Sequence, residues 1–139
     1  MSDSDQDAVA QRIGESINPK AVRKSLRKHV GRLAEILHDG EEVRGAVMGL
    51  VDGSTRIRLV VVTDRRFVSL ALRVGGATEH SIPLGEVASV SGSTGMMKGS
   101  LMISTTGSGP GIALKTVDKK QLGAFTSAAN DAIADGRQQ

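Results

Sequence analysis

Short apolar runs separated by turn residues fill the middle of the chain, from Glu42 to Val117. The two clearest runs, Leu59–Val62 and Phe67–Leu72, flank the polar tetrad Thr63-Asp64-Arg65-Arg66. Runs this short, rich in valine and bounded by turn residues, are typical of buried strands. Thr63 and Asp64 favour a tight turn because their side chains can hydrogen-bond their own backbone. The pattern therefore predicts a β-hairpin centred on the tetrad.

The same alternation of apolar runs and turn signals predicts seven strands. They are expected near Glu42–Val51, Arg56–Thr63, Phe67–Val74, Glu79–Pro83, Val87–Ser91, Gly99–Thr105 and Gly111–Val117. No helical pattern separates them, so an antiparallel sandwich or barrel is expected. Two strands are apolar on both faces. We expect one face, formed by Val60, Val62, Phe67 and Ala71, to be buried under the N-terminal helix or against a second copy of the protein.

A helical pattern stands at each end of the strand region. Asn18 is a typical N-cap with Pro19 at the first helical position, and apolar residues then recur every three or four positions to about Leu37. Asp118 is the expected cap of a final helix, from Lys119 to about Ala134, whose apolar side could close one end of a barrel. The predicted organisation is an acidic, partly disordered N-terminus over 1–18, a basic amphipathic helix over 19–38, a domain over 39–135 and a tail over 136–139.

Charge is distributed unevenly although the formal net charge is only +3. Residues 1–18 carry four acids and one Arg, residues 19–38 carry six basic residues and one Glu, and residues 53–75 carry five Arg and one Asp. The basic side of the N-terminal helix could bind acidic lipid, nucleic acid or an acidic partner. It could equally be a solvated face on a helix that packs against the domain. Its basic residues are Lys20, Arg23, Lys24, Arg27, Lys28 and Arg32.

Composition excludes several classes of site. The chain has no Cys, Trp or Tyr and only two Phe, so it offers no thiol chemistry and no aromatic platform on which bases could stack. Its three His residues are scattered, with no metal-ligand spacing. No nucleophile elbow occurs, and the glycine-rich stretch Gly92–Gly99 precedes a strand rather than a helix. We therefore expect no catalytic residues, no metal and no cofactor.

The beginning of the chain and its apolar runs bear on where the protein acts. The first residues are acidic, the opposite of a signal peptide's basic start. No apolar run approaches the roughly 20 residues that span a bilayer. We expect a cytoplasmic protein that could be peripheral to the membrane.

Three segments together resemble a known family. They are Leu37-His-Asp-Gly-Glu-Glu-Val43, the hairpin Leu59–Phe67, and Ser81-Ile-Pro-Leu-Gly-Glu-Val-Ala-Ser-Val90. In this order they resemble the bacterial pleckstrin-homology-like (PH-like) domains of the YokE-like type, over roughly Leu37 to Ile133. The resemblance implies an α+β, mostly β fold: a PH-like seven-stranded antiparallel two-sheet barrel capped by a C-terminal helix, here preceded by the N-terminal amphipathic helix. Members of this family are mostly of unknown function, and oligomeric assembly is known among bacterial relatives.

Four arginines near the first two hairpins are candidate binding residues. Eukaryotic PH domains that bind phosphoinositides carry basic residues around the first hairpin, and Arg56-x-Arg58 falls at the matching place, without the upstream Lys of that pattern. These two arginines could clamp a phosphate or be edge-strand charges that block aggregation. Arg65 and Arg66 could pair with Asp64 to stabilise the turn or form a prong that binds a partner.

These patterns favour a non-enzymatic PH-like binding module that mediates protein–protein interaction or self-assembly. One alternative is peripheral binding to anionic membrane lipid through the basic helix, aided by Arg56 and Arg58, which would be salt-sensitive. The other is non-specific nucleic-acid binding by the same helix. No small-molecule substrate is indicated.

Overall fold

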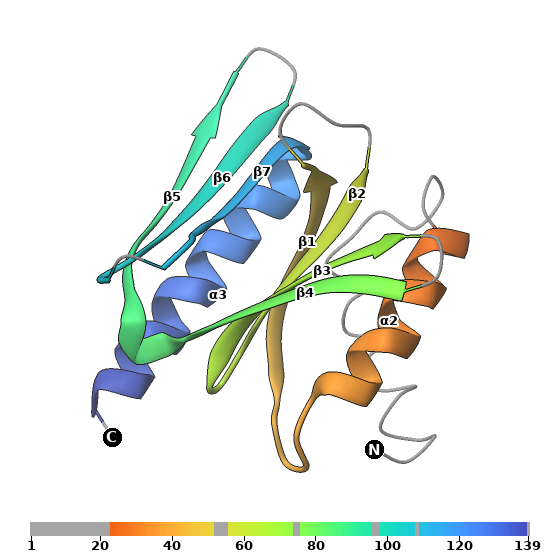
Figure 1. Ribbon diagram of the computed structural model, residues 1–139. Helices are drawn as coiled ribbons and strands as arrows, with labels where there is room; N and C mark the ends of the chain where they lie inside the picture. Colours follow the sequence, from red (N-terminus) through yellow and green to blue (C-terminus); the bar gives the residue numbers. More distant parts are fainter. Residues whose placement is uncertain (1–22, 52–55, 74–75, 96–97, 108, 139) are drawn as a thin grey trace.

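The structure is a computed structural model that describes residues 23–51, 56–73, 76–95, 98–107 and 109–138. In the described chain, seven strands follow helix α2 and precede helix α3, and Figure 1 shows their arrangement. In chain order the elements are α2 (Arg23–Ile36), β1 (Val43–Leu50), β2 (Ile57–Thr63), β3 (Arg66–Arg73), β4 (Gly76–Pro83), the 3₁₀ turn η1 (Leu84–Glu86), β5 (Val87–Thr94), β6 (Gly99–Thr105), β7 (Ile112–Val117) and α3 (Lys119–Gln138).

All the strand pairs are antiparallel, in the order β4-β3-β2-β1-β7-β6-β5. The sheet curls into an open half-barrel with β4 and β5 at its edges. β1 and β7 are joined at a single residue pair, Leu50 with Lys115. The sheet therefore consists of two parts, β1–β4 and β5–β7, that separate beyond this pair. The predicted seven-stranded antiparallel fold with a C-terminal helix is confirmed.

The inner face of the sheet packs against α3. Leu122, Phe125 and Ala129 of α3 enter a core with Val47 and Ile103 of the sheet, and all of them are buried. The rings of Phe67 and Phe125 meet edge to face, with their centroids 6.2 Å apart. The helix thus bridges both parts of the sheet, because it packs on β1 and β2 as well as on β5 and β6.

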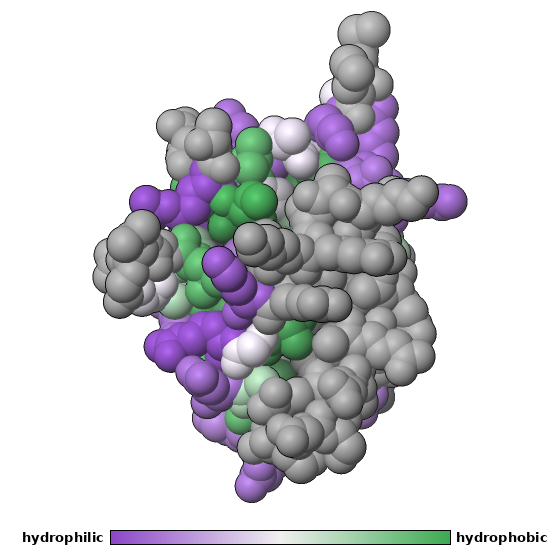
Figure 2. All heavy atoms as spheres, turned by 90° about the vertical axis from the view of Figure 1, so that its right-hand side faces the viewer, coloured by the Kyte–Doolittle hydropathy of each residue, from purple (hydrophilic) through white to green (hydrophobic). Residues whose placement is uncertain are grey.

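The outer face of β1–β3 forms a second core with α2. Leu33 of α2 is fully buried among Leu59, Val61 and Leu70 of the sheet, and Val30 and Leu37 complete this layer. Figure 2 looks onto the side of the molecule where α2 lies, and the described hydrophobic residues visible there form patches between hydrophilic ones. The predicted helix start, Asn18-Pro19, lies outside the described residues.

The helices cover the opposite faces from those the strand pattern indicated. We expected α2 or a second copy over Val60, Val62, Phe67 and Ala71. These residues are buried, but the first three belong to the inner core with α3. Alternation places Ala71 on the same face as Phe67. The apolar stripe of α2 covers the other face, where Leu59 and Val61 make β2 equally apolar.

Several element ends differ from the predicted ones. β5 runs to Thr94 rather than Ser91, because Gly92, Ser93 and Thr94 continue to pair with β6. β4 begins at Gly76, where it pairs with Arg73. α3 continues to Gln138, so residues 136–138 of the expected tail belong to the helix, and Gln139 lies outside the described residues. Its last turns are held by an ion pair between Arg44 and Asp135 and by the position of Gly136 beside Leu84.

Candidate anion-binding site

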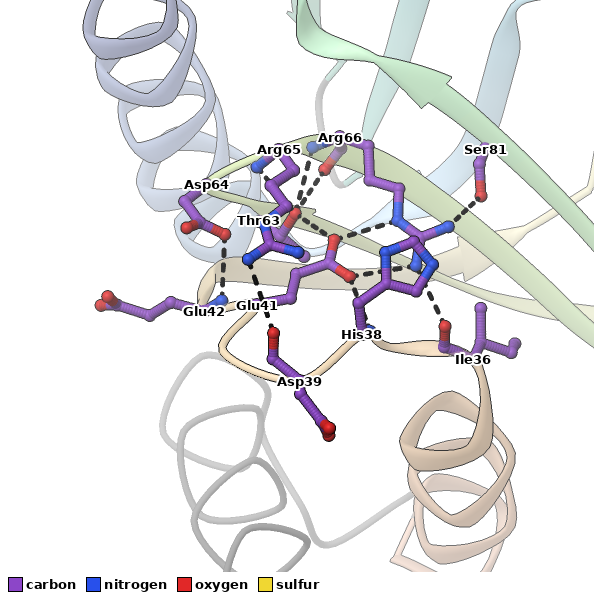
Figure 3. Close-up of polar contacts among 10 residues, drawn as sticks. All are labelled: Ile36, His38, Asp39, Glu41, Glu42, Thr63, Asp64, Arg65, Arg66 and Ser81. Atoms are coloured by element: carbon purple, nitrogen blue, oxygen red, sulfur yellow. Dashed lines mark hydrogen bonds and ion pairs between the residues drawn. The ribbon is translucent and has the colours of Figure 1, made fainter. Parts of the chain in front are cut away.

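The tetrad Thr63–Arg66 forms a tight turn built on the Thr63 hydroxyl (Figure 3). Its oxygen accepts hydrogen bonds from the backbone N–H groups of Arg65 (3.1 Å) and Arg66 (3.0 Å). The same hydroxyl donates to Oε2 of Glu41 at 2.7 Å. The carboxylate of Asp64 accepts from the backbone N–H of Glu42 at 3.0 Å. The tetrad therefore fastens the β2–β3 turn to the segment that leads into β1.

Arg66 is held in a bidentate ion pair with Glu41. Its Nε and Nη2 donate to the two carboxylate oxygens at 2.9 and 3.0 Å. Nη2 also donates to the carbonyl of Ile36 at the end of α2, and Nη1 donates to Ser81 of β4. One guanidinium thus joins the end of α2, the segment that leads into β1, and β4 (Figure 3). The sequence pattern suggested Asp64 as its partner, but the carboxylate it contacts lies 25 residues away in the chain.

The Glu41 carboxylate is fully buried and remains charged. Burial alone would raise its pKa, but hydrogen bonds from Arg66, Thr63 and the backbone N–H of His38 lower the pKa to about 2. The charge of Arg66 is thereby balanced inside the protein.

Arg65 points outward and is exposed, with a long hydrogen bond of 3.5 Å to the carbonyl of Asp39. Of the two tetrad arginines, only Arg65 is placed to meet a partner.

The basic face of α2 is described only in its second half. Lys28 is exposed. Arg32 is bonded both to Glu35 and, across to β4, to Glu79 (2.9 and 2.8 Å), so two carboxylates offset its charge. Lys20 and the side chains of Arg23, Lys24 and Arg27 lie outside the described residues.

Arg58 is the candidate whose surroundings are most unusual. Its partner on β1 is Gly49, and a Cβ at Gly49 would meet Leu114 and Val117 of the inner core. Cross-strand partners point to the same face, so Arg58 also faces inward, near the start of β2. The side chain is half-buried, and its Nε atom is buried without a hydrogen-bond partner among the described residues. Burial lowers the pKa of Arg58, and the exposed Arg56 nearby lowers it further.

Further basic residues come to the same end of the half-barrel from distant segments. Lys115 pairs with Leu50 at the end of β1, Lys98 precedes β6, and Lys119 and Lys120 begin α3. Figure 1 shows the end of β1, the start of β6 and the start of α3 at the top. Asp118 lies there too, but its carboxylate caps α3 by accepting from the N–H groups of Lys120 and Gln121. These lysines escaped sequence reasoning because they come from segments of nearly neutral local charge.

A cleft elsewhere in the described chain is less suited to an anion. A cleft of about 290 Å³ lies between β4 and the β6–β7 turn, but its lining includes Glu86 and no Lys or Arg. Within the described residues, no group of three or more His, Cys, Asp or Glu is placed to hold a metal ion. Neither described helix is both long and apolar enough to cross a bilayer.

Comparison with known proteins assigns the fold. A family model described as a bacterial PH domain matches residues 37–131, more than half of the chain. The chain belongs to the bacterial PH domain family. This match begins at Leu37 and contains both the Glu41 segment and the tetrad, so the ion pair that joins them lies within the PH domain. α2 precedes the matched region.

Two solved structures are similar to this PH domain. One is a DUF1696 family protein with a pleckstrin-homology domain from Shewanella loihica, with 17% identity and a TM-score of 0.48 over 71% of this chain and 94% of that one. The other is a pleckstrin homology domain from Shewanella amazonensis, with 21% identity and a TM-score of 0.45 over 64% of this chain and 72% of that one. No curated protein has a sequence that matches this chain.

Proposed function

We propose that this bacterial PH domain is a non-enzymatic binding module that takes up an anionic group, a phosphate above all, at Arg58 with Arg56 beside it. PH domains are in general binding modules without enzymatic activity. The observation that carries the proposal is the half-buried guanidinium of Arg58, whose Nε finds no acceptor in the described parts of the chain. The nearby charge that acts on it is another cation, Arg56.

A half-buried cation of this kind destabilises the folded domain when no ligand is bound. Buried charges are normally paired and hydrogen-bonded, because removing them from water without compensation is unfavourable. Arg66 follows this rule through Glu41, whereas Arg58 does not. An anion docked at Arg58 would supply the missing acceptor, and guanidinium groups bind phosphate oxygens in a matching planar geometry.

The lysines at the same end of the half-barrel favour a ligand that carries more than one negative charge. Lys98 and Lys120 lie on the same end of the half-barrel, and a cluster of one sign attracts and concentrates anions. Such a ligand could be a phosphorylated lipid headgroup at a membrane or a soluble polyphosphate. The recognition chemistry is the same for both, and the experiment must separate the two sources.

The test uses pyrophosphate and vesicles that contain an anionic phospholipid. Pyrophosphate is titrated into the full chain and followed by calorimetry, and the vesicles are tested by co-sedimentation at low and high salt. We expect Arg58→Met to lose binding while the free energy of unfolding without ligand stays equal or rises by up to about 1 kcal/mol. The matched control is Arg65→Met, an exposed arginine at the opposite end of β2, which should bind normally. Unchanged binding by Arg58→Met would show that the site lies elsewhere.

The two probes separate the two sources of ligand. Binding to vesicles that needs Arg58 and Lys120, and fades with salt, would assign the site to a membrane headgroup. Binding to pyrophosphate alone would assign it to a soluble ligand. If Lys28→Glu rather than Arg58→Met removed vesicle binding, the basic face of α2 would be the contact surface instead.

A protein partner is the second candidate function, and the free edge strand β5 favours it. This strand ends the sheet, and most of its residues are exposed. Self-assembly through Val60, Val62 and Phe67 has no such support, because α3 covers these residues.

A further inference from the structure

The two edges of the sheet differ in how they are protected. β4 carries Glu79, which is paired with Arg32 of α2, and ends at Pro83. The Nε2–H of His80 donates to the carbonyl of Pro110 at 2.9 Å, so the β6–β7 turn lies against this strand. Charges, proline and covering segments are the means by which edge strands avoid pairing with other chains. β4 is therefore closed to strand addition.

β5 has none of these protections. Its eight residues, Val87–Thr94, include no charge and no proline, and six of them are exposed. The pairing with β6 is irregular only between Val87 and Ser89, and from Ser89 to Thr94 the register is continuous. In the described sheet no strand lies on its other side. A regular, uncharged edge of this length is a template for another strand.

We propose that β5 pairs antiparallel with β5 of a second copy of the protein about a twofold axis, joining two half-barrels into one continuous sheet. A twofold contact of this kind closes on itself and gives a dimer. The inference does not depend on the central residue of the anion site, because Arg58 lies on β2; of the residues named for that site, Lys98 is the one that lies next to β5.

Charge complementarity selects a second copy as the occupant. An antiparallel pair places the beginning of one β5 beside the end of the other. Glu86 directly precedes β5, and Lys98 follows it in a turn closed by the hydrogen bond from the Gly95 N–H to the Lys98 carbonyl (2.9 Å). Each Glu86 would therefore lie near Lys98 of the other copy, twice in the dimer. Between these ends the strand carries no charge, so no like charges meet.

The two faces of β5 also suit a self-pair. The outer face of β5 carries three serines, Ser89, Ser91 and Ser93. The hydroxyl of Ser93 already forms a hydrogen bond with that of Ser100 on β6 at 2.9 Å. Hydroxyl pairs of this kind stabilise neighbouring strands. On the inner face Val90 is only partly buried at the rim of the core. An added strand would cover the exposed part of Val90 and remove it from water.

The oligomeric state of the full chain tests the proposal. Light scattering and sedimentation velocity over a wide range of protein concentration should show a monomer–dimer equilibrium. Ser91→Lys brings two like charges together near the twofold axis, and we expect its dissociation constant to rise about tenfold or more. Thr78→Lys is the matched control, because Thr78 is an exposed residue on the opposite edge strand, and it should dimerise like the unmodified chain. Circular dichroism verifies that both variants fold.

A charge exchange makes the test specific to the antiparallel arrangement. Glu86→Lys and Lys98→Glu should each weaken the dimer, and the chain with both changes should regain most of the affinity, because each changed residue then meets a complementary one. A monomer at all concentrations would overturn the proposal. So would an oligomer larger than a dimer, or a dimer that Ser91→Lys leaves intact.

Discussion

The buried Glu41–Arg66 pair should make the stability of this domain depend on acid in a defined way. The pKa of Glu41 is about 2 in the folded domain, against an ordinary value of 4.5. A difference of this size corresponds to about 3 kcal/mol. Because folding lowers the pKa, the carboxylate contributes this stabilisation fully above about pH 4.5. The contribution is lost as the pH falls from there toward 2.

Glu41→Gln removes the charge while keeping the shape of the side chain. It leaves the guanidinium of Arg66, whose side chain is only 16% exposed, without its carboxylate. Breaking one partner of such a pair is strongly destabilising, so we expect the free energy of unfolding at pH 7 to fall by about 3 kcal/mol. The variant should also lose less stability than the unmodified chain between pH 5 and pH 3, because it has no carboxylate at this position.

Urea unfolding followed by circular dichroism, at a series of pH values from 7 to 3, measures both quantities. Glu35→Gln is the control, because Glu35 also pairs with an arginine, but its side chain is 66% exposed. The control should change the free energy by less than about 1 kcal/mol. A Glu41→Gln variant that matches the control, or that keeps the full acid sensitivity, would refute the role given to this pair.

Three further predictions concern packing and backbone. Leu33→Ala should cost about 2–5 kcal/mol in urea unfolding, because Leu33 is fully buried between α2 and the sheet, and a loss below 1 kcal/mol would mean that α2 does not stabilise the domain. A chain beginning at Leu37 should aggregate or bind a hydrophobic dye, since Leu59, Val61 and Leu70 then lose their cover; a well-behaved monomer would contradict this. Gly111→Ala should destabilise the domain by about 1–3 kcal/mol, because a Cβ there would overlap the carbonyl of Ile103, whereas Gly107→Ala, with open space around it, should be nearly neutral.

The strand pattern and the family resemblance were sufficient to predict the fold. Each strand carries its own signal, such as Leu59–Val62 followed by the turn at Thr63 and Asp64, and a signal of this kind is local. The cover of each sheet face could not be assigned in the same way, because β2 and β3 are apolar on both sides. The apolar pattern allowed either helix on either face of the sheet. Only the folded structure shows which helix covers which face.

The candidate site was less accessible from sequence. Arg58 could be proposed from its position after the first turn, but its missing partner is a property of three-dimensional packing. Lys98 and Lys120 reach the same end of the half-barrel only because β5, β6 and β7 fold back on one another. Arg66 was a candidate because of its charge, but β1 and β2 separate it from its partner Glu41 in the sequence. Long-range pairing of this kind leaves no local signal.

The single pair between Leu50 and Lys115 has a consequence for how the chain reaches its native state. β1–β4 and β5–β7 are each formed by consecutive strands, so each can form through contacts close in sequence, which are the fastest to make. The step that unites them is the docking of α3, the last element of the chain, on both at once. We expect Phe125→Ala to slow folding less than it speeds unfolding, since its contacts form after the two meanders. The docking of α3 would then be the final step of folding, after both groups of strands have formed.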